Sequence, residues 1–191
     1  MIASGFGVGS GSAILKDSLP SASKVAYLTP QRAWENTGGQ ALQRTLQQVG
    51  RQLELSVFPM LLRESTASEY QRVFAESAAE HPDALIVNDI ADHFPYRKLI
   101  VELAEKSRLP AIYGYREYVE AGGLMAYGSD LGELMRRMAD DVHQILNGTK
   151  PGDIPIYQST KFELVINLKA AKALGLALPL SLLARADELI E

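Results

Sequence analysis

Residues 109–128, LPAIYGYREYVEAGGLMAYG, contain the pattern that decides the predicted fold. A short apolar run from Leu109 to Tyr113 is followed by a loop rich in Gly, Tyr and Arg, and by a second apolar run from Leu124 to Tyr127. Short apolar runs bounded by turn residues are typical of buried strands. The stretch therefore predicts a strand, a loop and a strand, with aromatic and cationic side chains where the strands end.

The same pattern repeats toward the N-terminus. Strands are predicted at residues 24–28, 52–58, 84–87 and 111–113, and helices at residues 13–19, 34–50, 67–79 and 94–107. Apolar runs that alternate with amphipathic helices indicate parallel βαβ units. We therefore expect an α/β fold with an open, doubly wound parallel sheet of about five strands between Lys24 and Gly128.

The pattern changes after Gly128. Asp130 is placed to cap a long helix over residues 131–147, in which apolar residues recur at helical spacing. The apolar residues are Leu134, Met138, Val142 and Ile145. A loop rich in Pro and Gly then leads to an extended run at residues 162–166 and to two predicted helices, at 168–174 and 180–190.

The composition is that of an ordinary globular protein. The chain has 191 residues, of which 47% are hydrophobic and 22% charged, with a formal net charge of -4. Lys and Arg are scattered, which argues against nucleic-acid binding, and the absence of cysteine excludes disulfides and thiolate chemistry. No apolar run reaches the roughly 20 residues that span a bilayer. The start, MIASGFGVGSGSAI, has no basic segment, so we expect no export signal in this chain.

Polar side chains follow the predicted strands. Ligands of open parallel sheets lie beyond the carboxyl ends of the strands. The candidate ligand-binding residues are therefore Thr29, Gln31, Asn88, Asp89, Tyr113, Tyr115, Arg116 and Tyr127. This mixture suits a small zwitterion. Asp89 would neutralise an ammonium group, Arg116 or loop amides would bind a carboxylate, and the faces of the tyrosine rings would stack on an apolar body. Other roles stay open: Asn88 and Asp89 as helix caps, Tyr113 in the core, and Arg116 in an ion pair.

Motifs for catalysis, metals and cofactors are missing. His81, His93 and His143 are far apart and have no metal-ligand spacing with carboxylates. The serines lie in no G-x-S-x-G elbow, and the GVGSGS stretch follows no predicted strand, as a dinucleotide or phosphate loop would. We therefore expect no enzyme activity, no metal and no cofactor.

Three segments carry a resemblance to a known family: 119–128 (VEAGGLMAYG), 159–176 (STKFELVINLKAAKALGL) and 181–191 (SLLARADELIE). They resemble the C-terminal half of the ABC-transporter substrate-binding proteins of the tryptophan/tyrosine-binding type, a type I periplasmic-binding-protein-like family, over residues 13–191. The resemblance implies a flavodoxin-like lobe with extra C-terminal helices, a small organic solute such as an aromatic or other amino acid, an ABC permease as partner, and a periplasmic or extracytoplasmic location. It also implies a first lobe ahead of this sequence.

The resemblance divides the chain into three parts. Residues 1–12 would be a flexible leader, residues 13–128 the α/β ligand-binding lobe, and residues 129–191 an inter-lobe crossover helix, a hinge strand and C-terminal helices. By resemblance, helix 131–147 packs on the first lobe. The alternative is a truncated homo-oligomeric sensory or scaffold module, in which the uncovered apolar stripe of helix 131–147 forms a homodimer.

Overall fold

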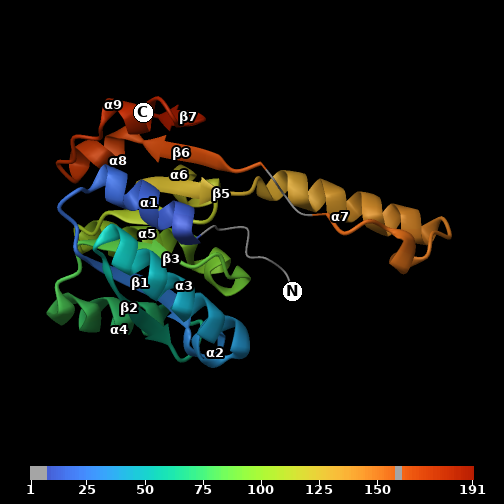
Figure 1. The fold of residues 1–191 in the computed structure, drawn as a ribbon, viewed down its shortest axis with the longest axis horizontal. Helices are drawn as coiled ribbons and strands as arrows, with labels where there is room; N and C mark the ends of the chain where they lie inside the picture. The colour runs from blue at the N-terminus through green and yellow to red at the C-terminus, as the bar shows by residue number, and fades with distance from the viewer. Residues whose placement is uncertain (1–7, 158–160) are drawn as a thin grey trace.

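The computed structural model describes residues 8–157 and 161–191, and its centre is a seven-stranded sheet (Figure 1). The strands are β1 Lys24–Pro30, β2 Ser56–Leu62, β3 Ala84–Val87, β4 Ala111–Tyr113, β5 Met125–Gly128, β6 Glu163–Asn167 and β7 Glu188–Ile190. Their order across the sheet is β2-β1-β3-β4-β5-β6-β7. Neighbouring strands are parallel except β5 and β6, which are antiparallel.

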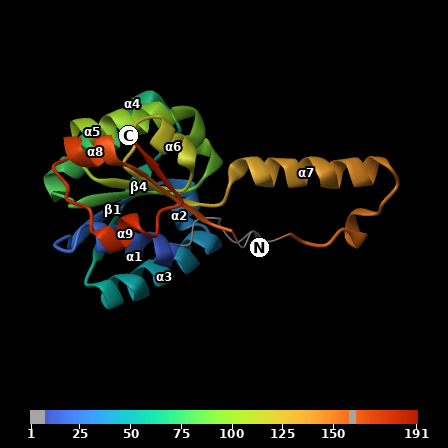
Figure 2. The ribbon, with the colours of Figure 1, turned by 90° about the horizontal axis from the view of Figure 1, so that it is seen from above.

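Helices cover both faces of the sheet. The α-helices are α1 Val8–Ser18, α2 Gln31–Glu35, α3 Thr37–Leu53, α4 Ala67–Ser77, α5 Arg97–Lys106, α6 Arg116–Glu120, α7 Leu131–Leu146, α8 Leu168–Ala173 and α9 Leu180–Leu183; the 3₁₀ helices are η1 Ala78–Glu80, η2 Ala91–Tyr96 and η3 Pro151–Asp153. α4, α5 and α6 lie on one face, and α1, α3 and α9 on the other (Figure 2). The predicted open, doubly wound α/β fold is confirmed.

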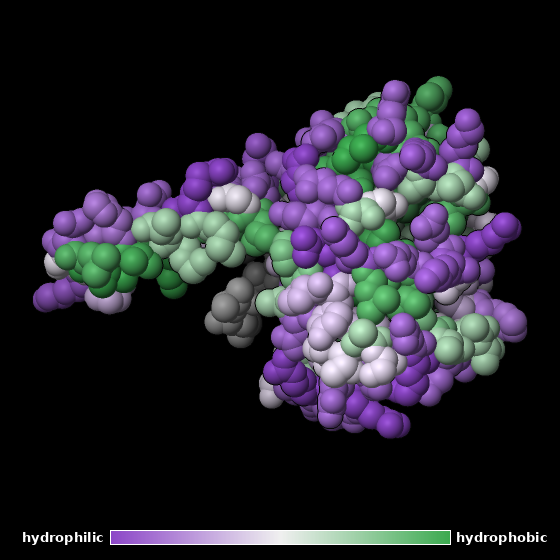
Figure 3. Space-filling view, turned by 180° about the vertical axis from the view of Figure 1, so that it is seen from behind, coloured by the Kyte–Doolittle hydropathy of each residue, from purple (hydrophilic) through white to green (hydrophobic). Residues whose placement is uncertain are grey.

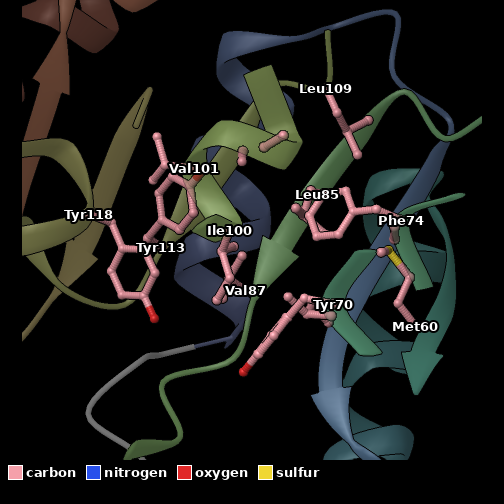
Figure 4. Close-up of a cluster of buried hydrophobic side chains, with 14 of the residues drawn as sticks. Met60, Tyr70, Phe74, Leu85, Val87, Ile100, Val101, Leu109, Tyr113 and Tyr118 are labelled. Carbon is pink, nitrogen blue, oxygen red and sulfur yellow. The ribbon is translucent and has the colours of Figure 1, made fainter. Parts of the chain in front are cut away.

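Each face has its own apolar core, because side chains alternate between the two faces along a strand. On the face of α4 and α5, Leu85 and Val87 of β3 pack with Tyr70, Phe74 and Ile100 (Figure 4). On the opposite face, Ala84 and Ile86 of the same strand belong to the core under α1 and α3. β3 is buried along its whole length, which explains why its apolar run was readable in the sequence.

α7 projects away from the sheet and its covering helices (Figures 1 and 2). None of its residues is buried. Met135, Met138, Val142, Ile145 and Leu146 are among its exposed apolar residues, and Leu146 is 81% exposed. Apolar side chains run along the projecting helix in Figure 3. The apolar stripe predicted for this helix therefore exists and is uncovered in the described chain.

Several predicted boundaries were wrong for local reasons. The helix predicted at 34–50 is two helices, because Asn36 adopts extended backbone and caps α3, its side chain accepting a bond from the Gly39 amide at 2.8 Å. α3 then continues to Leu53 and ends at Glu54, which is in the left-handed conformation. The strand predicted at 52–58 consequently begins only at Ser56.

The C-terminal helix predicted at 180–190 is also wrong. α9 ends at Leu183, and residues 188–190 form β7, which pairs in parallel with β6. Asp187 holds this pairing in place: its amide donates to the Leu164 carbonyl and its carboxylate accepts from the Leu164 amide, both at 2.8 Å. Strand pairing thus overrode a helical pattern. Five strands lie between Lys24 and Gly128, as predicted, and β6 and β7 extend the sheet to seven.

Two further predictions concern short segments. The loop predicted after β4 contains a turn of helix, α6. The flexible leader predicted at residues 1–12 overlaps α1 from Val8 onward, and its first seven residues lie outside the described part of the chain.

Candidate functional site

The carboxyl ends of β1 to β5 meet at one edge of the sheet, because these strands run parallel. We call this the carboxyl edge. β6 runs in the opposite direction and begins there, with Glu163 opposite Gly128. The eight predicted binding residues lie in the ends of these strands or in the segments that directly follow them. The fold therefore brings the predicted set to one edge, although its members have different surroundings.

Thr29 and Asn88 form the buried floor of this edge. Thr29 is the penultimate residue of β1, and its side chain is buried together with that of Asn88. The Asn88 side-chain amide donates to Thr29 Oγ1 at 3.3 Å, and the Asn88 backbone amide donates to the Leu28 carbonyl at 3.1 Å. These bonds fasten the end of β3 to the end of β1, which fixes the start of the loop that carries Asp89.

Asp89 and Tyr115 connect the loops that follow β3 and β4. The Tyr115 hydroxyl donates to the Asp89 backbone carbonyl at 3.2 Å, and both residues are half-buried. Burial first, and the negative charge of Asp89 second, raise the pKa of the Tyr115 phenol to about 12. Tyr115 thus stays a neutral donor at physiological pH. The Tyr115 ring also meets the Phe94 ring edge to face, with 6.2 Å between the ring centroids, so two aromatic rings lie together here.

Arg116 is engaged in ion pairs within the lobe. Its guanidinium lies 3.1 Å from Glu120, 3.4 Å from Glu163 and 2.7 Å from Glu188. These partners come from α6, β6 and β7, so Arg116 ties three elements together. The ion-pair role that the sequence left open is therefore the one observed, and a single cation among three carboxylates is a poor partner for the carboxylate of a solute.

Tyr113 belongs to the core. It is 1% exposed and its ring stacks on Tyr118 at 4.7 Å between centroids, with an interplanar angle of 12°. Gly123 makes room for this ring, since a Cβ at Gly123 would lie 2.6 Å from Tyr113 Cε2. The core role that the sequence left open is the one observed for Tyr113, and the glycine is required for close packing.

Gln31 and Tyr127 flank the edge. Gln31 begins α2 and its side-chain amide donates to Glu35 at 2.7 Å. Tyr127 lies on β5, three strands from β1 in the sheet, and stacks on Phe162 at 5.6 Å between centroids. Three strand spacings are about 14 Å, so one small solute that contacts Asp89 would reach at most one of these two flanks.

The sequence reading missed a buried histidine behind the β3 loop. His93 is 0% exposed, and its Nδ1 lies 2.7 Å from the Tyr70 hydroxyl. Burial is the largest influence and lowers the pKa of His93 to about 4, while Leu28 and Asp92 act in the opposite direction. The imidazole is therefore neutral at pH 7. The histidine spacing was considered only for metal binding. The position of His93 six residues after a buried strand is the signal that could have indicated its burial.

Polar contacts also join the loops after β1, β2 and β3. Asp92 forms an ion pair with Arg32 and accepts a bond from the Ser65 hydroxyl at 3.3 Å. The bond with Arg32 is the main reason that the pKa of Asp92 lies below its ordinary value. Ser129, directly after β5, is 5% exposed and its hydroxyl has no hydrogen-bond partner among the described residues. It adds a buried hydroxyl donor at this edge.

The described residues contain no group of three His, Asp or Glu side chains that could hold a metal ion. Within the same residues, no helix combines the length and apolar character needed to cross a membrane. The carboxyl edge offers hydrogen-bond donors and acceptors, carboxylates that include Asp89 and Asp92, and aromatic faces. Such a set can recognise and hold a polar molecule.

α7 leaves the lobe from the carboxyl edge. β5 ends at Gly128, α7 begins at Leu131, and the chain returns to the same edge where β6 begins at Glu163 (Figure 1). The return segment lies along the helix, since the Tyr157 hydroxyl donates to Glu133 at 2.8 Å and the Arg137 guanidinium lies 5.7 Å from the Tyr157 ring centroid. The polar edge is therefore flanked by a projecting helix with an uncovered apolar stripe.

A family model described as ABC transporter substrate binding protein matches residues 13–190. The chain belongs to this family. The family is one of substrate-binding proteins, the class that the sequence predicted. A sequence search found no curated protein that matches this chain.

Solved structures with the same fold include three proteins of 18–22% identity. A conserved domain protein from Vibrio cholerae has a TM-score of 0.84 and 22% identity over 98% of this chain. An ABC domain from Streptococcus pneumoniae, solved in complex with L-Trp, has a TM-score of 0.78 and 21% identity over 95%. A substrate-binding protein with adhesive properties from Clostridium difficile, in a ligand-free open structure, has a TM-score of 0.67 and 18% identity over 99%. The chain of 191 residues spans 61% of the length of each of these three proteins.

Proposed function

We propose that this chain is the ligand-binding lobe of a two-lobed, extracytoplasmic substrate-binding component of an ABC importer, and that it binds a small zwitterionic solute at its carboxyl edge. The family match over residues 13–190 carries the proposal. The chemistry of the carboxyl edge supports it. The Tyr115 hydroxyl donates to the Asp89 carbonyl, and Asn88, the residue before Asp89, donates to Thr29, at the place where open parallel sheets bind ligands.

Aromatic amino acids are the first solute class to test. The structurally similar domain from Streptococcus pneumoniae was solved with L-Trp. In this chain, the Asp89 carboxylate would accept the ammonium group, and the Tyr115 and Phe94 rings would pack on the side chain of the solute. Arg116 is already paired with three glutamates, so the proposed partners for the solute carboxylate are loop amides and the Ser129 hydroxyl.

α7 is proposed to seat the second lobe. Its apolar stripe projects from the same edge that holds the proposed site, so a lobe packed on α7 would cover that edge. The similar structures are longer than this chain, which spans 61% of them. Removing this stripe from water would supply roughly 25 cal/mol per Å² of apolar area, a favourable term for lobe docking. Closure of two lobes around a hinge would then enclose the solute.

A homodimer through α7 is the second candidate, and the exposure of Met138, Val142 and Leu146 favours it. The two candidates differ in the behaviour of the chain of 191 residues. Multi-angle light scattering at rising concentration should give a monomer if α7 awaits another lobe. A dimer that is lost on Met138→Glu would support the scaffold alternative instead.

The proposed function is tested by calorimetric titration with an amino-acid panel on a two-lobed protein, in which the first lobe of a similar structure precedes this chain. Binding of at least one amino acid is expected, whereas the single lobe should bind weakly because it supplies one wall. Absence of binding by the two-lobed protein to every small solute tested would refute the proposal.

A further inference from the structure

A hollow lies at the end of the sheet opposite the carboxyl edge. Its volume is about 470 Å³, and it is bounded by the start of β4, the residues before β5, and the helices α5, α6 and α8. Leu109 and Leu124 place it at the amino ends of β4 and β5. This volume lies in the range of small-molecule sites, about 300–1,000 Å³. Apart from Tyr113, none of the eight predicted binding residues lines it.

The walls of this hollow are mainly apolar. They include Val101, Leu109, Val119, Leu124, Leu174 and Ile190. These side chains come from α5, α6, α8 and β7 and from the loops before β4 and β5, so no single element forms the hollow. Gly122 and Gly123 also line it, and Gly122 has a φ of 106°, a conformation that glycine adopts without strain. The apolar walls would accept a hydrocarbon or aromatic body.

Two cations without an ion-pair partner lie on the lining. Arg108 and Lys169 both border the hollow, and no ion pair in the described part of the chain involves either of them. Two carboxylates, Glu105 and Glu120, also border the hollow, and Glu120 lies 3.1 Å from Arg116, a cation that it shares with Glu163 and Glu188. Arg108 and Lys169 are thus the groups of this lining that can pair with an anionic group on a ligand.

Asn167 adds an amide to the same lining. Its side-chain oxygen accepts a bond from the Ala170 amide at 2.9 Å and so caps α8. This bond uses the oxygen and orients the side chain, which leaves the NH₂ group of Asn167 as a donor at the hollow. A donor and two cations at the border of an apolar cavity match a carboxylate that is attached to an apolar chain.

We infer that this hollow is a second ligand site, distinct from the carboxyl edge, which binds an amphipathic carboxylate with its apolar body against Leu109, Val119 and Leu124 and its carboxylate toward Arg108 and Lys169. A free fatty acid of medium length has this chemistry. Because the hollow lies at the opposite end of the sheet, this inference does not depend on the proposed solute site.

The test uses three probes with the same ten-carbon chain: decanoate, decanol and decyltrimethylammonium. Titration below the micelle concentration, followed by NMR chemical-shift changes, should give saturable binding of decanoate with shifts in α5, α6 and α8. Decanol should bind at least tenfold more weakly, and the cation more weakly still. Equal binding of all three probes, or shifts confined to α7, would overturn the inference.

Variants locate the site. Ala173 lines the hollow and is exposed, so Ala173→Trp should block binding without disturbing the core. Ala184 is also exposed but does not line the hollow, so Ala184→Trp is the control. Arg108→Asn with Lys169→Gln should weaken decanoate at least tenfold and leave decanol unchanged. Lys106→Gln, a neighbouring exposed cation outside the hollow, is the matched control. Full decanoate affinity in both the tryptophan variant and the double charge variant would refute the site, and melting curves would verify that each variant is folded.

Discussion

Protonation of His93 should destabilise the lobe in mild acid. The buried imidazole has a pKa of about 4 in the folded chain, against about 6.5 for an unperturbed histidine. Between these two values the unfolded chain binds the additional proton, so the free energy of unfolding falls as the pH is lowered from 6.5 toward 4. The difference of about 2.5 pKa units corresponds to roughly 3 kcal/mol at the end of this range, of which about 2 kcal/mol is lost by pH 5.

The pH range of this effect, between 6.5 and 4, separates His93 from the acidic groups. Carboxyl groups whose pKa is lowered, such as Asp83 and Asp92, contribute stability that is lost only as the pH falls below about 4. The burial of Tyr70 raises the pKa of its phenol, so this hydroxyl keeps its proton and can donate to Nδ1 of the neutral imidazole. A protonated imidazole could not accept that bond, and its charge would be buried, since His93 is 0% exposed.

Urea unfolding followed by circular dichroism between pH 7 and pH 4.5 measures this effect. His93→Phe should lower stability at pH 7 by about 1–3 kcal/mol, because the buried Tyr70 hydroxyl loses its partner, but it should remove most of the pH dependence between 6.5 and 4.5. His143→Gln, a change of an exposed histidine on α7, is the control and should keep the wild-type dependence. Equal stability of the wild type at pH 7 and pH 5, or an unchanged slope in His93→Phe, would refute the reasoning.

Three further substitutions test the account. Gly128→Ala should destabilise the lobe by about 1–3 kcal/mol in urea unfolding, because the new Cβ would overlap the Gly114 carbonyl oxygen. Gly152 has open space around it, so the control Gly152→Ala should change the free energy of unfolding by less than about 0.5 kcal/mol. Arg116→Gln should lower the free energy of unfolding by about 1 kcal/mol, since the ion pairs of Arg116 are partly exposed. The same substitution should leave the solute affinity of the two-lobed protein unchanged. A large loss of affinity would return Arg116 to the binding site. Met138→Glu should change the unfolding free energy of the single lobe by less than about 0.5 kcal/mol, because α7 buries no residue; a larger loss by calorimetry would mean that α7 packs on the lobe.

The sheet was predictable where strands are buried on both faces. β3 and β4 were placed at their observed bounds because Ala84–Val87 and Ala111–Tyr113 are continuous apolar runs. β7 was not predictable, since its residues are largely exposed and its strand pairing depends on Asp187 bonding to β6. Pairing between distant segments leaves little local pattern, so the sequence between α9 and the C-terminus read as a helix.

The candidate site was predictable as a location but not as a set of contacts. The rule that ligands lie at the carboxyl ends of parallel strands placed Asn88, Asp89 and Tyr115 together. Sequence could not reveal that Arg116 pairs with Glu163 and Glu188, because those partners are 47 and 72 residues away. Burial of Tyr113 against Tyr118 likewise depends on packing between a strand and a helix whose existence was not predicted.

The central claim is that the carboxyl edge is one wall of a closing solute site, with Asp89 as the partner of the ammonium group. The most direct measurement is calorimetric titration of the two-lobed protein with L-Trp, L-Tyr, L-Phe and L-Leu, before and after Asp89→Asn. We expect at least one amino acid to bind, and the substitution to weaken it about 10–100-fold, as the loss of a charged hydrogen-bonded pair requires. Unchanged affinity in Asp89→Asn would contradict the claim.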